Sequence, residues 1–231
     1  MNPYQQSVAT TRGGAQLAAD TNKVLRNTYA LLAMTLLFSA VTAGVSMALN
    51  VSPMVSLLCS VGALGLLWFV VPRTADSAAG LGVVFAVTGL LGFGLGPILN
   101  HYLGMANGPQ IVMVAMGGTG AIFLGLSAYV LTTRKDFSFL GGFLFAGIMV
   151  AFLGAIAVLV ASLFGVALPG VALAISAMFV LLMCGLILFE TSRIINGGET
   201  NYILATVSLY VSIYNLFTSL LHLLGAASGD D

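Results

Sequence analysis

Residues 139–164 read FLGGFLFAGIMVAFLGAIAVLVASLF, a continuous apolar stretch that contains no charged side chain. The hydrocarbon core of a bilayer is about 30 Å thick, and an α-helix needs about 20 residues to cross it at about 1.5 Å per residue. Soluble domains rarely contain a run of this length and composition. The stretch therefore predicts a membrane-spanning helix.

Six further apolar runs lie on either side of this one, separated by short links that contain Gly, Pro, Asn or Ser. The runs are 28–49, 54–71, 78–99, 111–131, 171–189 and 202–224. The chain is 59% hydrophobic and only 6% charged, with a mean hydropathy of +1.09, and these values exclude a water-soluble domain. We predict an all-α integral membrane protein, a bundle of seven transmembrane helices without a second domain.

The two ends of the chain differ from the spans. Residues 1–22 are rich in Gln, Thr, Ser, Ala and Gly, and we expect them to form a flexible cytoplasmic tail. Residues 23–225 form the transmembrane domain, and residues 226–231 form a short outer tail. The first run, 28–49, follows basic residues as the core of a signal peptide does, but such a core has only about 7–15 apolar residues. We therefore expect an uncleaved first helix.

Composition and motifs exclude several classes of function. Seven basic residues balance seven acidic ones, so no basic surface is available for nucleic acid. Cys59 and Cys184 lie singly inside apolar runs, without the neighbouring ligands of a metal site or the partner of a redox motif. Residues 125–128, GLSA, fall one residue short of the GxSG motif of intramembrane serine proteases. We predict a protein that is not an enzyme and has no cofactor.

Small residues recur at helix-packing spacings in the third and fourth runs. Gly92 and Gly96 are four residues apart, and Gly118 and Gly125 repeat on the next predicted helix. Small residues let two helices approach closely in lipid, where packing and interhelical hydrogen bonds replace the hydrophobic effect. We expect both pairs to lie at helix contacts in a compact bundle.

The last run carries the clearest polar pattern. Five polar side chains are spaced four, three, four and three residues apart, which places them on one face of a helix. These residues, which we call the polar stripe, are Ser208, Ser212, Asn215, Ser219 and His222. In one interpretation the stripe forms interhelical hydrogen bonds that fix this helix in the bundle. In the other it lines a hydrated path through the membrane.

Glu190 ends the sixth apolar run, and Arg193 follows three residues later. In one interpretation the two residues form an ordinary ion pair near the membrane surface. In the other, Glu190 takes part in gating or ion binding, because ionisable residues within spans are costly and mark functional sites. The link to the last run is short, so we expect Glu190 to approach Ser208 and Ser212.

Four stretches of the chain together resemble the Bax inhibitor family, specifically its bacterial YccA-like branch. They are KVLRNTY at 23–29, GFGLGPILN at 92–100, the segment 127–142 across the fourth link, and the segment 188–217. The resemblance covers about residues 23–225. It implies that the last helix is central and wrapped by the other six, with a site between the last two helices.

The resemblance also implies function. Calcium-leak members of the family pair two acidic residues at that site, one late in helix six, which Glu190 matches, and one in helix seven, where this chain has Ser212. Members of the YccA-like branch are associated with the membrane-anchored, ATP-dependent protease FtsH, both as substrates and as modulators. The resemblance thus implies an inner-membrane regulatory protein of bacteria that binds FtsH and limits degradation of membrane proteins, with residues 1–20 as a handle for the protease. The alternative is a pH-sensitive leak channel for calcium ions or protons.

The basic residues predict the orientation of the spans, because Lys and Arg in short loops favour the cytoplasm. All of them precede the first run or lie in the links after the second, fourth and sixth runs: Arg12, Lys23, Arg26, Arg73, Arg134, Lys135 and Arg193. Reporter fusions at the amino terminus should therefore give a cytoplasmic signal, and fusions after Asp231 a periplasmic one. A cytoplasmic signal after Asp231 would mean that the last run is re-entrant.

Overall fold

The computed structural model describes the backbone of residues 3–229 and the side chains of residues 19–229. Every regular element in this part of the chain is helical. The elements are α1 Pro3–Ala48, α2 Pro53–Gly65, a π turn at Leu66–Val70, α3 Val71–Thr74, α4 Ala79–Leu103, α5 Gly108–Thr133, a 3₁₀ turn at Ser138–Leu140, α6 Gly141–Leu163, α7 Pro169–Ile195 and α8 Tyr202–Ala227.

Seven helical segments are long and apolar enough to cross a membrane, which confirms the predicted fold class. The first span is the part of α1 from Ala19 onward, and α2, the π turn and α3 together form the second. Five of the spans begin and end within four residues of the predicted runs. The first and the sixth are exceptions: the first begins at Ala19 rather than at Thr28, and α7 continues past the apolar run to Ile195. Its last turns bury polar side chains, among them Glu190 and Ser192.

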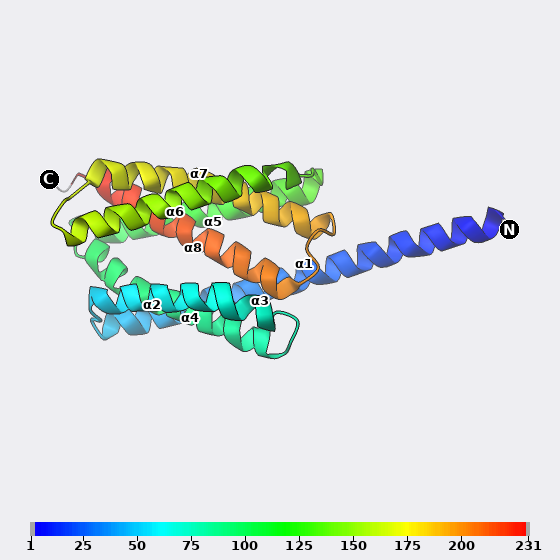
Figure 1. Cartoon of the computed structure of the whole chain (residues 1–231), viewed down its shortest axis with the longest axis horizontal. Helices are drawn as coiled ribbons and strands as arrows, with labels where there is room; N and C mark the ends of the chain where they lie inside the picture. Colours follow the sequence, from blue (N-terminus) through cyan, green and yellow to red (C-terminus); the bar gives the residue numbers. More distant parts are fainter. Residues whose placement is uncertain (1–2, 230–231) are drawn as a thin grey trace.

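The amino-terminal segment begins as part of α1. The backbone is helical from Pro3 onward, and Figure 1 shows α1 projecting well beyond the bundle, while the flexibility of residues 1–22 stays a prediction. Proline is favoured in the first turn of a helix, and no other proline occurs before Pro53. Met1 and Asn2 lie outside the described residues, as do Asp230 and Asp231 of the expected outer tail.

Pro72 accounts for the irregular second span. A proline within a helix has no N–H to donate to the preceding turn. The backbone before Pro72 widens into the π turn Leu66–Val70, where the N–H of Val71 reaches back to the carbonyl oxygen of Leu66. The span therefore remains helical on both sides of the proline.

Figure 1 shows two helical layers with α8 between them. In one layer α1 and α2 pack against α4, and in the other α5 and α6 pack against α7. α8 runs diagonally between the layers and contacts α1, α4, α5 and α7. The last helix is therefore central, as expected, but four helices form its main contacts rather than all six. α2 and α6 lie outside, against α4 and α7.

Burial follows this arrangement. Within an apolar stretch of 18 residues in each span, 56% of the residues of α8 are buried, against 11% in each of the second and fifth spans. Large side chains of α6, such as Phe143 and Phe145, are exposed on the outside of the bundle. Such exposure is stable in lipid, because hydrocarbon chains are as apolar as these side chains.

Gly92 and Gly96 allow α1 and α4 to pack closely, as their spacing predicts. A Cβ atom at Gly92 would overlap the carbonyl oxygen of Ser39, and a Cβ atom at Gly96 would overlap the side chain of Ser46. The contact points advance in the same direction along both helices, so α1 and α4 run parallel. Close backbone approach at this contact strengthens the dispersion interactions that hold helices together in lipid.

The second glycine pair does not form a comparable contact. Gly118 meets only Leu220, at an ordinary 3.7 Å, and a Cβ atom at Gly125 would have no neighbour within 4 Å. Gly125 faces outward from α5. The expectation of a helix contact at Gly125 is therefore wrong.

Replacing Gly92 by alanine should destabilise the bundle by about 1–3 kcal/mol, because α1 and α4 must move apart to relieve the overlap. Gly125→Ala is the matched control, since it adds the same methyl group to an open site. Thermal unfolding in detergent would compare the two proteins. Equal melting temperatures for both variants would show that the α1–α4 contact is not tightly packed.

Candidate functional site

Glu190 lies near the end of α7, where the structure pairs it with Arg193. Its side chain is buried, and one carboxylate oxygen lies 3.4 Å from an Nη atom of Arg193. The guanidinium group also stacks over the ring of Phe189, with its Cζ atom 5.5 Å from the ring centroid. The Arg193 side chain is 33% exposed, so its charge remains partly hydrated. The ion pair proposed from the spacing of the two residues is thus formed.

A second carboxylate, which the sequence analysis did not select, belongs to the same cluster. An Oε atom of Glu199 lies 3.3 Å from Nη2 of Arg193. Glu199 follows the turn at Gly197, whose positive φ of 76° reverses the chain between α7 and α8. One Arg193 therefore bridges two glutamates, and the cluster carries one excess negative charge if all three side chains are ionised. The sequence feature that could have indicated this contact is the glycine turn at Gly197, which brings Glu199 back to Arg193.

The part of the polar stripe nearer the start of α8, Ser208 and Ser212, lies beside this cluster. Ser208 adjoins the carboxylate of Glu190, as expected. Ser212, one turn further along α8, is fully buried and donates its hydroxyl proton to the carbonyl oxygen of Ser208 at 2.8 Å. The hydroxyl of Ser212 is therefore satisfied within its own helix.

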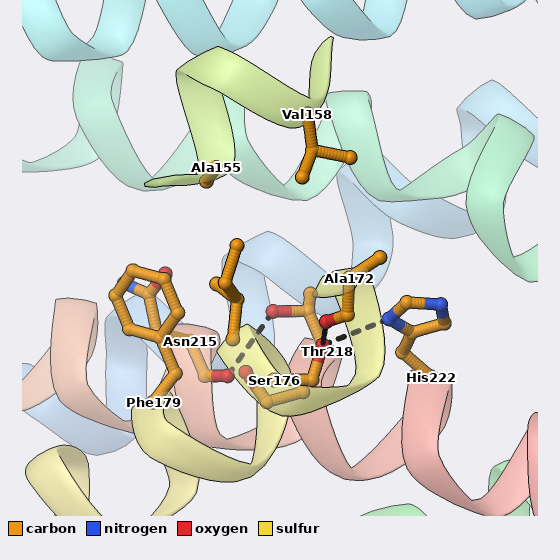
Figure 2. A pocket seen from close by; sticks show the side chains of 10 residues that line it. Ala155, Val158, Ala172, Ser176, Phe179, Asn215, Thr218 and His222 are labelled. Atoms are coloured by element: carbon orange, nitrogen blue, oxygen red, sulfur yellow. Dashed lines mark hydrogen bonds between the residues drawn. The ribbon is translucent and has the colours of Figure 1, made fainter. Parts of the chain in front are cut away.

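The part of the stripe nearer the end of α8 lines a cavity. Asn215, Ser219 and His222 face a space of about 260 Å³ between α6, α7 and α8 (Figure 2). Figure 2 shows Ala155 and Val158 of α6 across this space. The stripe is thus divided into a part beside the Glu190 cluster, Ser208 and Ser212, and a part that lines the cavity, Asn215, Ser219 and His222.

Ser176 on α7 is a further polar residue of the cavity that the sequence analysis missed. Its Oγ atom lies 2.8 Å from Nδ1 of His222 and 3.0 Å from the carbonyl oxygen of Ala172 (Figure 2). A lone serine in an apolar run gives no signal of this kind in the sequence. Its importance follows only from the packing of α7 against α8.

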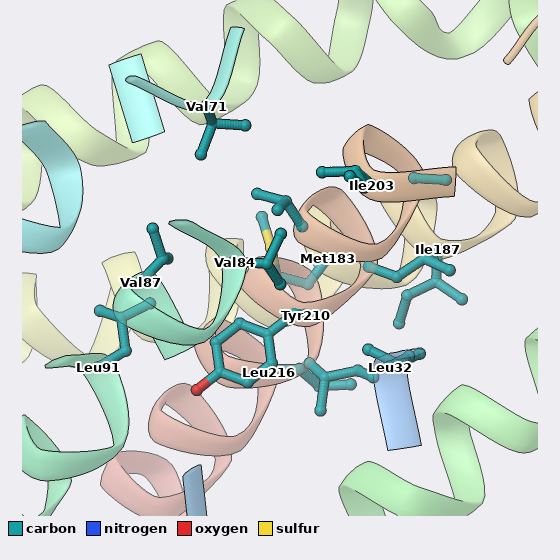
Figure 3. Packing of buried hydrophobic residues seen from close by; sticks show 14 of the residues in the cluster. Leu32, Val71, Val84, Val87, Leu91, Met183, Ile187, Ile203, Tyr210 and Leu216 are labelled. Atoms are coloured by element: carbon teal, nitrogen blue, oxygen red, sulfur yellow. The ribbon is translucent and has the colours of Figure 1, made fainter. Parts of the chain in front are cut away.

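Tyr210 joins α8 to the layer of α1 and α4. Its hydroxyl lies 2.6 Å from Oγ of Ser39 and donates to the carbonyl oxygen of Thr88 at 3.3 Å. The ring is almost completely buried, and Figure 3 shows it among apolar side chains that include Leu216. The side of α8 next to the polar stripe therefore serves to fix the helix in the bundle.

Polar contacts also tie together the links at the end of the bundle that carries Glu190. Asn201 accepts hydrogen bonds from the N–H groups of Ile203 and Leu204, and so caps α8. Its Nδ2 atom donates to the carbonyl oxygen of Ala75 at 3.0 Å and to a carboxylate oxygen of Asp76 at 2.8 Å. The start of the central helix is therefore anchored to the α3–α4 link.

Ser192 anchors the α5–α6 link in a similar way. Its Oγ atom accepts a hydrogen bond of 2.8 Å from the N–H of Phe137. The neighbouring carboxylate of Asp136 accepts hydrogen bonds from the hydroxyl and the N–H of Ser138, which lower the pKa of Asp136, and Ser192 adds a weaker contribution. The carboxylate thus remains ionised at neutral pH and holds the link.

No group of three or more His, Cys, Asp or Glu side chains that could hold a metal ion occurs within residues 19–229. The cavity beside α8 contributes one such residue, His222. The Glu190 cluster contributes two carboxylates, but Arg193 lies against both. Both regions are therefore better suited to hydrogen bonding and ion pairing than to direct coordination of a cation.

Comparison with known proteins identifies the relatives of the chain. The profile of the family described as "Inhibitor of apoptosis-promoting Bax1" matches residues 21–229. The protein of Escherichia coli K12 named "Modulator of FtsH protease YccA" is 56% identical, over 91% of this chain and 93% of its own length. An uncharacterized membrane protein of Vibrio cholerae is 48% identical, over 96% and 97% of the two chains. The mouse protein named "Protein lifeguard 4" is 28% identical, over 88% and 85%.

Arg193→Gln should destabilise the protein by about 1–3 kcal/mol, because it leaves the carboxylate of Glu190 buried without its cation. Glu190→Gln should destabilise the protein less than Arg193→Gln, since it removes the buried charge itself. The double variant should be more stable than Arg193→Gln alone. Unfolding of the four proteins in detergent gives the coupling energy of the pair. An unchanged stability of Arg193→Gln would show that hydration alone accommodates Glu190.

Proposed function

The chain belongs to the Bax inhibitor family, and we propose that it is a regulatory protein of the bacterial inner membrane that binds the protease FtsH and limits degradation of other membrane proteins. The observation that carries this proposal is the 56% identity to the protein named as a modulator of FtsH, over nearly the full length of both chains. The family match over residues 21–229 takes in six of the seven spans whole and all but the first two residues of the other.

The shape of the protein supports such a role. The first part of α1 projects beyond the bundle at the end where the links after α3, α5 and α7 lie (Figure 1). An isolated helix is only marginally stable in water, so an ATP-dependent protease can engage it at little cost. The bundle behind it is held by buried packing and by hydrogen bonds between distant segments. A substrate that is easy to engage and hard to extract occupies its protease for a long time.

The alternative expectation, a pH-sensitive leak of calcium ions or protons, has weaker support. Glu190 lies against Arg193, and Ser212 at the second family position is buried and bonded within α8. α8 contains no acidic residue that could share a proton with Glu190. Residues 208 and 212 therefore act in our proposal as part of the packing between α7 and α8.

Deletion of residues 1–20 should lengthen the lifetime of the protein in cells that contain FtsH, because the protease loses the segment by which it engages the chain. Pulse-chase measurements would give the half-life. A matched control replaces residues 1–20 by a Gly/Ser segment of the same length, which should keep the short half-life because it restores an unpacked handle. An unchanged half-life after deletion would contradict the handle.

Modulation itself is tested separately with purified FtsH in proteoliposomes. Addition of this protein should slow the degradation of a second membrane substrate, and the variant without residues 1–20 should slow it less. An unrelated seven-helix protein at the same density controls for crowding of the bilayer. Equal degradation rates with this protein and with the control would refute the proposed function.

A further inference from the structure

The cavity between α6, α7 and α8 is independent of the proposed interaction with FtsH. It begins near the end of the bundle at which α8 ends and extends toward the middle of the membrane. At about 1.5 Å per residue, His222 lies roughly 8 Å and Asn215 roughly 18 Å along the helix from Ala227. The hydrocarbon core is about 30 Å thick, so Asn215 lies near half depth.

The hydrogen bonds around Ser176 indicate which ring nitrogen of neutral His222 carries the proton. A serine hydroxyl has one proton, and the carbonyl oxygen of Ala172 can only accept, so Ser176 donates to Ala172. The contact of 2.8 Å between Ser176 and Nδ1 of His222 then requires the proton on Nδ1. In the neutral ring, Nε2 therefore carries a lone pair and is an acceptor.

Asn215 adds a second acceptor. Its Nδ2 atom donates to the carbonyl oxygen of Val211 at 2.8 Å, which leaves the side-chain oxygen for the cavity. Ser219 supplies a hydroxyl on the same wall. The wall formed by α8 thus offers several groups that can receive a hydrogen bond from a small molecule.

The facing wall cannot satisfy these groups. α6 contributes only the side chains of Ala155 and Val158, and the aromatic ring of Phe179 on α7 closes one side. A polar group left without a partner at membrane depth costs several kcal/mol. The volume of about 260 Å³ has room for several waters, each of which takes about 30 Å³ in the liquid.

We propose that this cavity is a water-filled binding site that opens to the membrane side at which α8 ends and admits small hydrogen-bond-donating solutes. Its acceptors are Nε2 of His222, the side-chain oxygen of Asn215 and the hydroxyl of Ser219. None of the residues that line it is Asp, Glu, Lys or Arg, so the site selects by hydrogen bonding and size rather than by charge. Further along α8, Ser212 and Leu209 are fully buried, so the site is closed toward the Glu190 cluster.

Thiol labelling in sealed vesicles tests the proposal. In a background with Cys59→Ala and Cys184→Ala, Ser219→Cys places one thiol in the cavity. Leu216→Cys places a thiol in the packed core of the same helix, because Leu216 is fully buried, and Ser228→Cys marks the exposed end of α8. A charged, membrane-impermeant thiol reagent is added to each side in turn.

The expected result is that Ser219→Cys is labelled from the same side as Ser228→Cys, while Leu216→Cys is not labelled. Ala155→Phe, added to Ser219→Cys, should abolish labelling because it fills the cavity, whereas Leu153→Phe on the exposed face of α6 should leave labelling unchanged. Asn215→Cys serves as a second reporter if Ser219→Cys fails to fold.

Three results would overturn the proposal. Labelling by an apolar, membrane-permeant maleimide alone would show that the cavity opens to lipid. Absence of labelling by both reagents would show that it is closed and dry. Labelling from the side opposite to Ser228→Cys would show that water enters from the end that carries Glu190.

Discussion

Every polar group on the central helix must find a partner in the protein or in enclosed water, because the surrounding lipid supplies none. α8 is the least apolar of the seven spans and also the most buried. Its hydroxyl and amide groups are satisfied by bonds along its own backbone, as at Ser212 and Asn215, and by bonds to other helices, as at Tyr210. The helices of both layers supply partners for polar side chains of α8.

The two layers contribute differently to this arrangement. The layer of α1, α2 and α4 offers hydrogen-bond partners deep in the membrane, where Ser39 and Thr88 meet the hydroxyl of Tyr210. The layer of α5, α6 and α7 offers an ion pair at one end and a cavity near the other. α8 packs against both layers, most extensively against α7, and the cavity interrupts this packing where α6 faces it.

The features that depend on local composition could be predicted from the sequence. Seven spans followed from apolar runs, and the common face of Ser208 and Ser212 followed from helical periodicity. Contacts that depend on how helices pack could not be predicted in this way. Ser176 resembles any serine in an apolar run until α7 is placed against α8. Gly125, like Gly92, belongs to a set of small residues at helix-packing spacings, yet it faces outward. Glu199 becomes part of the site only because the turn at Gly197 returns it to Arg193.

The bond between Ser39 and Tyr210 joins residues that are 171 positions apart in the chain. During synthesis, α8 is the last of the seven spans to leave the ribosome. Until α8 is made, the hydroxyl of Ser39 and the space between the layers are without their final partner. The two layers can therefore be joined only after the last span has been made, whichever of the earlier helices have already packed together.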